Sequence, residues 1–311
     1  MIVLEEGQLS SKIENAIVTS GTFDGVHVGH RKILDGIREQ AHGAAYNSVV
    51  LTFWPHPRFV VNPNEKALKL LSTFEEKVQL LREANIDYLI KIPFTKEFSK
   101  LTSEEFIQKV LIDKIGTKKL VIGYDHHFGK NREGSFDYLQ ENASRFGFEI
   151  QEIPRQDVDH VGVSSTKVRN ALLEGKVYIA SEYLGRPYQI SGKVVSGNNL
   201  GTGLGFPTAN IKLQDDYKLI PGNGVYAVKV EVGGNIHEGM MNIGNRPTVD
   251  GKNQSMEVNI FDFDRDIYNE TVTVHFVKRI RDEEKFDGLA GLTAQLHEDK
   301  KKAVTILENL K

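Results

Sequence analysis

The sequence predicts two domains of different class: an α/β domain with a parallel sheet, followed by a small antiparallel β-barrel with a C-terminal helix. The chain of 311 residues is about twice the usual domain length. Its first half alternates short β-branched runs with amphipathic stretches, which is typical of βα units. From about Gly185, apolar residues recur at every second position between glycine, asparagine and aspartate turns. We therefore place the boundary within residues 175–186 and expect domains of 1–184 and 185–311.

The first half is expected to begin with a strand over residues 16–20, a helix over 29–41 and a second strand over 48–53. Further helices are predicted over 73–84, 103–111 and 166–174, and further strands over 88–92, 120–122 and 148–153. Gly175 ends the last of these helices, because glycine readily adopts the left-handed conformation that follows a helix C-terminus.

The second half carries period-two strands, predicted over 189–195, 225–232, 256–261 and 271–277. A helix near the end of the chain is indicated by apolar residues close to helical spacing, namely Leu289, Leu292, Leu296, Ala303 and Ile306. We expect this helix to pack on the barrel.

Charge and composition disfavour several kinds of partner. The 39 basic and 42 acidic side chains give a net charge of −3, which offers no general attraction for nucleic acid or an anionic membrane. The absence of cysteine removes thiolate nucleophiles, cysteine zinc sites and disulfides. The first residues lack a signal-peptide pattern, and no apolar run approaches the roughly 20 residues of a membrane helix. We expect a cytoplasmic protein with no nucleic-acid, membrane or obligate protein partner.

The segment GTFDGVHVGH, residues 21–30, joins the first predicted strand to the first predicted helix. Such a turn binds phosphate, because a helix N-terminus presents unpaired N–H groups and a positive dipole end. Gly21, Gly25 and Gly29 let the backbone approach an anion without a Cβ clash. His27 and His30, three residues apart, face the same side of one turn and could stabilise charge that develops on a phosphate. A capped helix with two surface histidines is the alternative.

A second phosphate-type segment is SSTKVR, residues 164–169. Its hydroxyl groups can cap the helix that starts there. Arg169 falls in the first turn, where a guanidinium is unfavourable beside the positive end of the helix dipole unless it meets an anion. These residues suggest a clamp on the β- and γ-phosphates of a nucleotide, and an ordinary cap with a solvated arginine is the alternative.

Together these two segments resemble the HxGH and ISSTxxR motifs of the nucleotidyltransferase superfamily. GYDHHFG at 123–129 and FWPHP at 53–57 make the first domain similar to the FMN adenylyltransferase branch, so a Rossmann-like nucleotidyltransferase domain is expected. His126 departs from that branch, which usually has phenylalanine there. The resemblance implies an ATP site formed by Gly21, Phe23, Asp24, His27, Gly29, His30, Asp125, Ser164, Ser165, Thr166 and Arg169, with Pro55, His56 and Pro57 near the flavin.

The second domain contains a glycine-rich segment, GTGLGFPTAN, at residues 201–210. By its residues alone it is a turn between strands. Thr208 and Asn210 place a hydroxyl and an amide oxygen two residues apart, as a magnesium–nucleotide site could use.

This segment matches the GFPTAN signature of riboflavin kinase, and the resemblance continues through GVYAV at 224–228, NIGNRPT at 242–248 and MEVNIFDF at 256–263. It implies that Thr208 and Asn210 hold magnesium and nucleotide phosphate and that Glu257 is the general base on the ribityl hydroxyl. The alternative for Glu257 is an ordinary half-exposed strand glutamate. The implied ATP residues are Gly203, Gly205, Pro207, Thr208 and Asn210, and the implied flavin residues are Asn242, Arg246 and Thr248. Departures from the family pattern are Ser196, Thr202, Asn259 and Asn269.

The resemblance covers nearly the whole chain and implies a bifunctional enzyme. Its barrel would phosphorylate riboflavin to FMN, and its first domain would join FMN to ATP, releasing FAD and pyrophosphate, with Mg²⁺ as the cofactor. A nucleotidyltransferase with another phosphorylated acceptor, such as phosphopantetheine, would leave the riboflavin-kinase motifs unexplained. A flavin-binding regulatory protein without turnover would not explain Glu257, Thr208 and Asn210 beside an HxGH domain.

Overall fold

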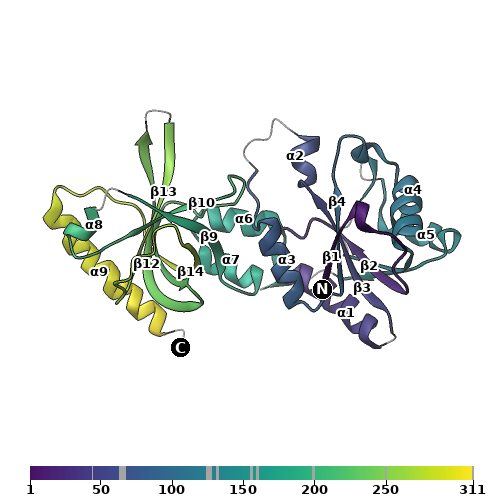
Figure 1. Ribbon diagram of the computed structural model, residues 1–311, viewed down its shortest axis with the longest axis horizontal. Coiled ribbons are helices and arrows are strands. Elements are labelled where there is room, and N and C mark those ends of the chain that lie inside the picture. Colours follow the sequence, from purple (N-terminus) through teal and green to yellow (C-terminus); the bar gives the residue numbers. More distant parts are fainter. Residues whose placement is uncertain are drawn as a thin grey trace. The chain divides into compact units, whose positions relative to one another are not determined.

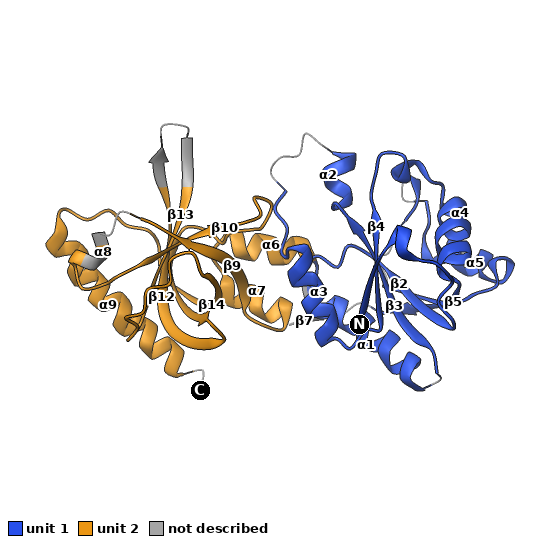
Figure 2. Ribbon diagram, in the orientation of Figure 1, with its two compact units in different colours: residues 1–164 blue, residues 165–311 orange. Residues whose placement is uncertain are grey.

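Two folding units divide the chain, residues 1–164 and residues 165–311 (Figure 2). The computed structural model describes residues 1–43, 45–62, 68–123, 128–130, 133–154, 157–158, 161–197, 200–248 and 251–309. Helices α6 (Ser165–Leu173) and α7 (Val177–Leu184) belong to the second unit, although the change of sequence pattern placed them at the end of the first domain. The boundary at residue 184 stays a prediction.

The first unit is built on a parallel six-stranded sheet with the order β1-β4-β3-β2-β5-β6 (Figure 1). Its strands are β1 (Ile2–Glu5), β2 (Ala16–Ser20), β3 (Asn47–Trp54), β4 (Tyr88–Pro93), β5 (Thr117–Gly123) and β6 (Glu149–Ile153). All five residues of the central strand β2 are buried. Helices cover both faces of such a sheet, so its strands are apolar on both sides. The predicted parallel α/β domain is confirmed.

Alternate residues of β2 enter two separate cores. Ile17 packs in a cluster with Leu34 of α1 and Leu81 of α3, whereas Val18 packs in a cluster with Ile107 and Leu139. The helices are α1 (Val28–Gly43), α2 (Pro57–Val61), α3 (Phe74–Glu83), α4 (Ser103–Phe106), which continues with π-helical spacing as η3 (Ile107–Ile115), and α5 (Phe136–Phe146). Short elements are the 3₁₀ turns η1 (Glu6–Gln8) and η2 (Phe98–Lys100) and the strands β7 (Asp157–Val158) and β8 (Val161–Gly162).

The second unit is a closed antiparallel barrel with the strand order β10-β13-β12-β11-β14-β9. Its strands are β9 (Tyr188–Val195), β10 (Ala209–Leu213), β11 (Gly224–Val232), β12 (Asn235–Thr248), β13 (Gly251–Ile260) and β14 (Thr271–Arg281), and a short helix, α8 (Leu200–Gly203), precedes β10. The predicted barrel is confirmed.

Helix α9 (Leu289–Glu308) lies against β11 and β12, as its apolar spacing predicted (Figure 1). Ala303 and Leu307 are fully buried in a cluster with Ala227 and Met240 of the barrel. This helix therefore covers part of the outer face of the barrel. In the described part of the chain, no helix combines the length and apolar composition needed to cross a bilayer.

Candidate active sites

The loop between β2 and α1 has an unusual backbone. Phe23, Gly25 and Val26 have φ angles of 46°, 79° and 39°. A β-branched residue such as Val26 rarely adopts this left-handed region, and backbone strain of this kind clusters at binding sites. The Gly21 N–H donates to the carbonyl oxygen of Leu51 on β3 at 3.0 Å, which fixes the start of the loop at the carboxyl end of the sheet. Residues 21–27 are called the phosphate loop below.

His27 and His30 lie on the same side of the first turn of α1, as their spacing predicted. Their rings stack with centroids 3.7 Å apart and an interplanar angle of 14°. His27 Nδ1 accepts a hydrogen bond from the His30 backbone N–H at 3.3 Å, so His27 caps α1. Because Nδ1 is an acceptor here, a neutral His27 carries its proton on Nε2. The Phe23 ring packs 5.0 Å from that of His30.

Asp24 anchors the phosphate loop to the segment before α3. Its carboxylate is 2% exposed, and Oδ1 accepts from the backbone N–H groups of Leu71 at 2.9 Å and Ser72 at 3.2 Å. The Gly25 N–H donates to Ser72 Oγ at 3.2 Å. These contacts give Asp24 a structural part in holding the loop, and its role in ATP binding stays a prediction.

Gly29, in the first turn of α1, leaves little room for a side chain. A Cβ at this position would lie 3.2 Å from His27 Nδ1 and 4.0 Å from the carbonyl oxygen of Val163. Val163 directly precedes Ser164, so the start of the second phosphate-type segment lies near the histidine turn. Ser165, Thr166 and Arg169 lie on α6 in the second unit, and Asp125 lies outside the described residues.

The Pro55-His56-Pro57 turn follows the carboxyl end of β3, the strand beside β2. His56 is 8% exposed and caps α2, since its Nδ1 accepts from the Arg58 N–H at 3.2 Å. Loops at the carboxyl ends of neighbouring parallel strands form the ligand-binding edge of an α/β sheet. The turn therefore belongs to the same edge as the phosphate loop, and its part in flavin binding stays a prediction.

A residue that the sequence analysis missed, Lys77 on α3, is buried at this edge, with only 2% of its surface exposed. Burial lowers the pKa of its ammonium group to about 8, against an opposing attraction from Asp24. Its position carried a signal: Lys77 lies three residues after Phe74 and four before Leu81, on the apolar face of the helix.

In the barrel, three predicted site residues form one row across neighbouring strands. Asn210 of β10 pairs with Glu257 of β13, which pairs in turn with Asn242 of β12. Directly opposed residues of antiparallel strands point to the same face. Met256 and Val258, on either side of Glu257 in the sequence, are 5% and 0% exposed and face the interior. Glu257 thus lies on the half-exposed outer face, between a predicted phosphate-site residue and a predicted flavin residue.

The GFPTAN loop is anchored at two points beside this row. Phe206 is 5% exposed and meets His297 of α9 edge-on with ring centroids 4.9 Å apart. Asn259 Nδ2 donates to the carbonyl oxygen of Pro207 at 2.6 Å. Asn259, a departure from the family pattern, therefore holds the residue directly before Thr208. Gly205 adopts a φ of 80°.

Thr208 lines a cavity of about 320 Å³ together with Phe263, Arg265, Asp266 and Tyr268. Asn210 lies against the backbone of Gly197, where an added Cβ would be 2.0 Å from its Nδ2. Hydroxyl and amide oxygens are hard ligands of the kind that Mg²⁺ accepts, so this donor set fits the ion. Gly203 lies on α8; Arg246 and Thr248 lie on β12, and their side chains are outside the described part.

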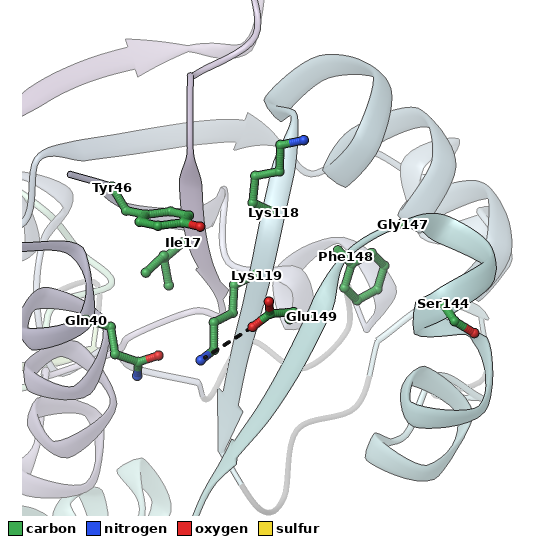
Figure 3. A pocket seen from close by; sticks show the side chains of 9 residues that line it. All are labelled: Ile17, Gln40, Tyr46, Lys118, Lys119, Ser144, Gly147, Phe148 and Glu149. Atoms are coloured by element: carbon green, nitrogen blue, oxygen red, sulfur yellow. Dashed lines mark ion pairs between the residues drawn. The ribbon is translucent and has the colours of Figure 1, made fainter. Parts of the chain in front are cut away.

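A second cavity, of about 530 Å³, lies at the amino ends of β2, β5 and β6 (Figure 3). Ile17, Lys118 and Glu149 line it, and Lys119 approaches Glu149 at 4.0 Å. This edge is opposite to the phosphate loop, and open α/β sheets bind ligands at the carboxyl ends of their strands. We assign it no role in the chemistry.

A parallel α/β unit followed by a closed barrel fits the expected class of two-unit transferases that act with a nucleotide. Two family models match the chain: that of FAD synthetase over residues 9–167, and that of riboflavin kinase over residues 184–307. The chain belongs to the family of bifunctional riboflavin kinase/FMN adenylyltransferases.

Its relatives include the bifunctional riboflavin kinase/FMN adenylyltransferase of Haemophilus influenzae, 38% identical over 289 residues that cover 92% of each chain. The Bacillus subtilis protein of the same description is 34% identical and covers 95% of this chain and 94% of its own. A crystal structure described as a macrolide-efflux protein from Streptococcus pneumoniae has a TM-score of 0.89 at 32% identity, covering 97% of this chain and 98% of that chain.

Proposed function

We propose that the chain converts riboflavin to FMN in the second unit and FMN to FAD in the first, with ATP as the donor in both reactions. The observation that carries this proposal is the row in which Glu257 lies between Asn210 and Asn242, beside the GFPTAN loop. Membership of the bifunctional family supports both activities.

In the kinase reaction, the terminal ribityl hydroxyl of riboflavin attacks the γ-phosphorus of ATP. Glu257 accepts the hydroxyl proton, the new O–P bond gives FMN, and ADP leaves with the electrons of the broken P–O bond. Thr208 and Asn210 would hold Mg²⁺, which when bound with ATP neutralises charge on the phosphates. The anchored GFPTAN loop keeps Thr208 in place for this task.

In the adenylyl transfer, a phosphate oxygen of FMN attacks the α-phosphorus of ATP and pyrophosphate leaves. The FMN phosphate is already ionised, so no general base is required and the protein supplies alignment and charge stabilisation. The cap on α1 uses His27 Nδ1, so a neutral His27 would donate toward the phosphates through Nε2–H. His30, stacked on His27, is the second group for the developing charge. Ser164, Ser165, Thr166 and Arg169 would bind the β- and γ-phosphates.

The substrates proposed here are small anionic or flavin molecules, and the compartment we propose is the cytoplasm. A net charge of −3 and a chain without cysteine suit an enzyme that meets its anionic ligands only at local sites.

The proposal is tested by incubating the protein with riboflavin, ATP and Mg²⁺ and separating the flavins over time. FMN should appear first and FAD second, with one ADP per FMN and one pyrophosphate per FAD. Tight flavin binding without ATP consumption would instead indicate a regulatory protein. Transfer to phosphopantetheine but not to FMN would indicate a different acceptor.

A further inference from the structure

Lys77 links α3 to the end of β3. Its Nζ lies 3.4 Å from Thr52 Oγ1 and 5.4 Å from the centroid of the Trp54 ring, over which the ammonium group can make a cation–π contact. Trp54 directly precedes the Pro55-His56-Pro57 turn. The buried ammonium group thus adjoins the strand end that leads to this turn.

Thr52 and Asp24 connect Lys77 to the phosphate loop. Thr52 Oγ1 lies 3.4 Å from the carbonyl oxygen of Thr22, to which it can donate while it accepts from Lys77. The Asp24 carboxylate attracts the ammonium group electrostatically and accepts two backbone N–H groups from the segment before α3. Within the part of the chain that the structure describes, Asp24 is the charged group that attracts the Lys77 ammonium, and the neutral Thr52 and Trp54 of β3 lie near its Nζ. Two connections therefore run from Lys77 to the loop.

We propose that Lys77 is a positioning residue for adenylyl transfer, whose buried ammonium group holds Thr52 and Asp24 and so fixes the strained loop that carries His27. This inference rests on the proposed adenylyl transfer. A buried charge is a poor way to stabilise a fold, because an apolar side chain of similar volume often serves as well or better. A role in placing the phosphate loop would explain why a lysine, and not an apolar residue, is buried at position 77.

The test compares Lys77→Met with the parent, using kcat/KM for FMN-to-FAD conversion with FMN supplied. Misplacement of a binding loop should lower this value about 10- to 100-fold. The riboflavin kinase activity of the same chain should stay at the parental level, since Lys77 lies in the other unit. Lys109→Met is the matched control: Lys109 is an exposed lysine of the same unit, and its Nζ pairs with Glu105 at 2.8 Å. This control should keep both activities.

A pH profile separates positioning from a purely structural role. The ammonium group is charged below its pKa of about 8 and loses its charge as the pH rises through that value. Parental kcat/KM for FAD formation should therefore fall above about pH 8, where the phosphates of both substrates are fully ionised. Lys77→Met should lack this decline.

Thr52→Val is a second variant that tests the same proposal if Lys77→Met does not fold. It removes the hydroxyl bridge and should lower FAD formation about 3- to 10-fold, the effect of one hydrogen bond, with the kinase unchanged. A folded Lys77→Met protein with the parental rate and pH profile would overturn the proposal. So would parental FAD formation by Thr52→Val, or a Lys77→Met protein that only melts earlier. The time course of the parental protein tests adenylyl transfer itself. A failure of that function would appear in the parental protein, whereas a failure of the Lys77 proposal would appear only in the variants.

Discussion

Glu257 is a half-exposed strand glutamate whose position in the barrel is common and whose neighbours are not. Its flanking residues Met256 and Val258 are buried in the barrel, so alternation alone puts it on the outer face. Its pairing with Asn210 and Asn242 is what distinguishes it from other half-exposed strand glutamates.

Glu257→Gln keeps the shape of the side chain and removes the base. Loss of a general base typically lowers a rate by about 10²–10⁴-fold, so riboflavin phosphorylation should fall by that order. Supplied FMN should still be converted to FAD. Separate assays with riboflavin and with FMN check this, and equal loss of both activities in a folded protein would refute the assignment.

Asn259→Ala removes the donor to the Pro207 carbonyl and loosens the residue before Thr208. We expect the KM for ATP in the kinase reaction to rise about 3- to 10-fold, the effect of one lost hydrogen bond, while FMN-to-FAD conversion is unchanged. Asn235→Ala, at an exposed asparagine of β12, is the control. Unchanged ATP kinetics in Asn259→Ala would show that this hydrogen bond is not needed to place Thr208.

At the scale of elements, helix α9 is tied to the barrel by a buried ion pair. Asp299 is fully buried, and its carboxylate accepts three hydrogen bonds of 2.8, 2.9 and 3.1 Å from the Arg281 guanidinium of β14. Asp299→Asn leaves the guanidinium without its counter-charge and should lower the free energy of unfolding by about 3 kcal/mol. Urea unfolding measures this. Asp262→Asn removes the loose, exposed pair with Lys300 and should have little effect; equal losses would contradict the account.

Sequence patterns predicted the elements that have a clear β-branched run or a clear apolar spacing. Strand β2 follows from its short β-branched run, which is buried throughout, and helix α9 follows from its apolar spacing. Strand β1 has only four residues at the sheet edge, and β10 begins inside the GFPTAN signature, which looks like a turn. Helix α5 is an exception: Phe136, Leu139, Ala143 and Phe146 follow helical spacing, and the prediction overlooked them.

Some features of the candidate sites could be predicted from the sequence and others could not. The spacing of His27 and His30 predicts a shared side, because one helical turn decides it. The row through Glu257 depends on the pairing of β13 with β10, a strand far away in the sequence, and no local pattern predicts that pairing. Lys77 was missed because a lysine is usually exposed, and only its place on the apolar face of α3 signals burial.

At the scale of the whole molecule, the pair of helices α6 and α7 packs with the barrel. The Gly222 N–H donates to the Leu172 carbonyl oxygen at 2.9 Å, and a Cβ at Gly175 would lie 2.9 Å from the Arg279 side chain. A fragment of residues 165–311 should therefore resist urea better than one of residues 185–311. Comparison of their unfolding midpoints and kinase rates checks this, and equal midpoints would support the boundary at residue 184 instead.

The central claim is that one chain holds two separate active sites that work in sequence. His30→Ala should lower kcat for adenylyl transfer about 10²–10³-fold, more than it raises the KM for ATP, because stabilisation of developing charge acts in the transition state.

When each variant is incubated by itself with riboflavin and ATP, His30→Ala should therefore accumulate FMN, and Glu257→Gln should leave riboflavin unconverted. The most direct measurement is the flavin time course of the two variants mixed: FAD should form from riboflavin, since each supplies the activity that the other lacks. Loss of both activities in either folded variant, or no FAD from the mixture, would contradict the account.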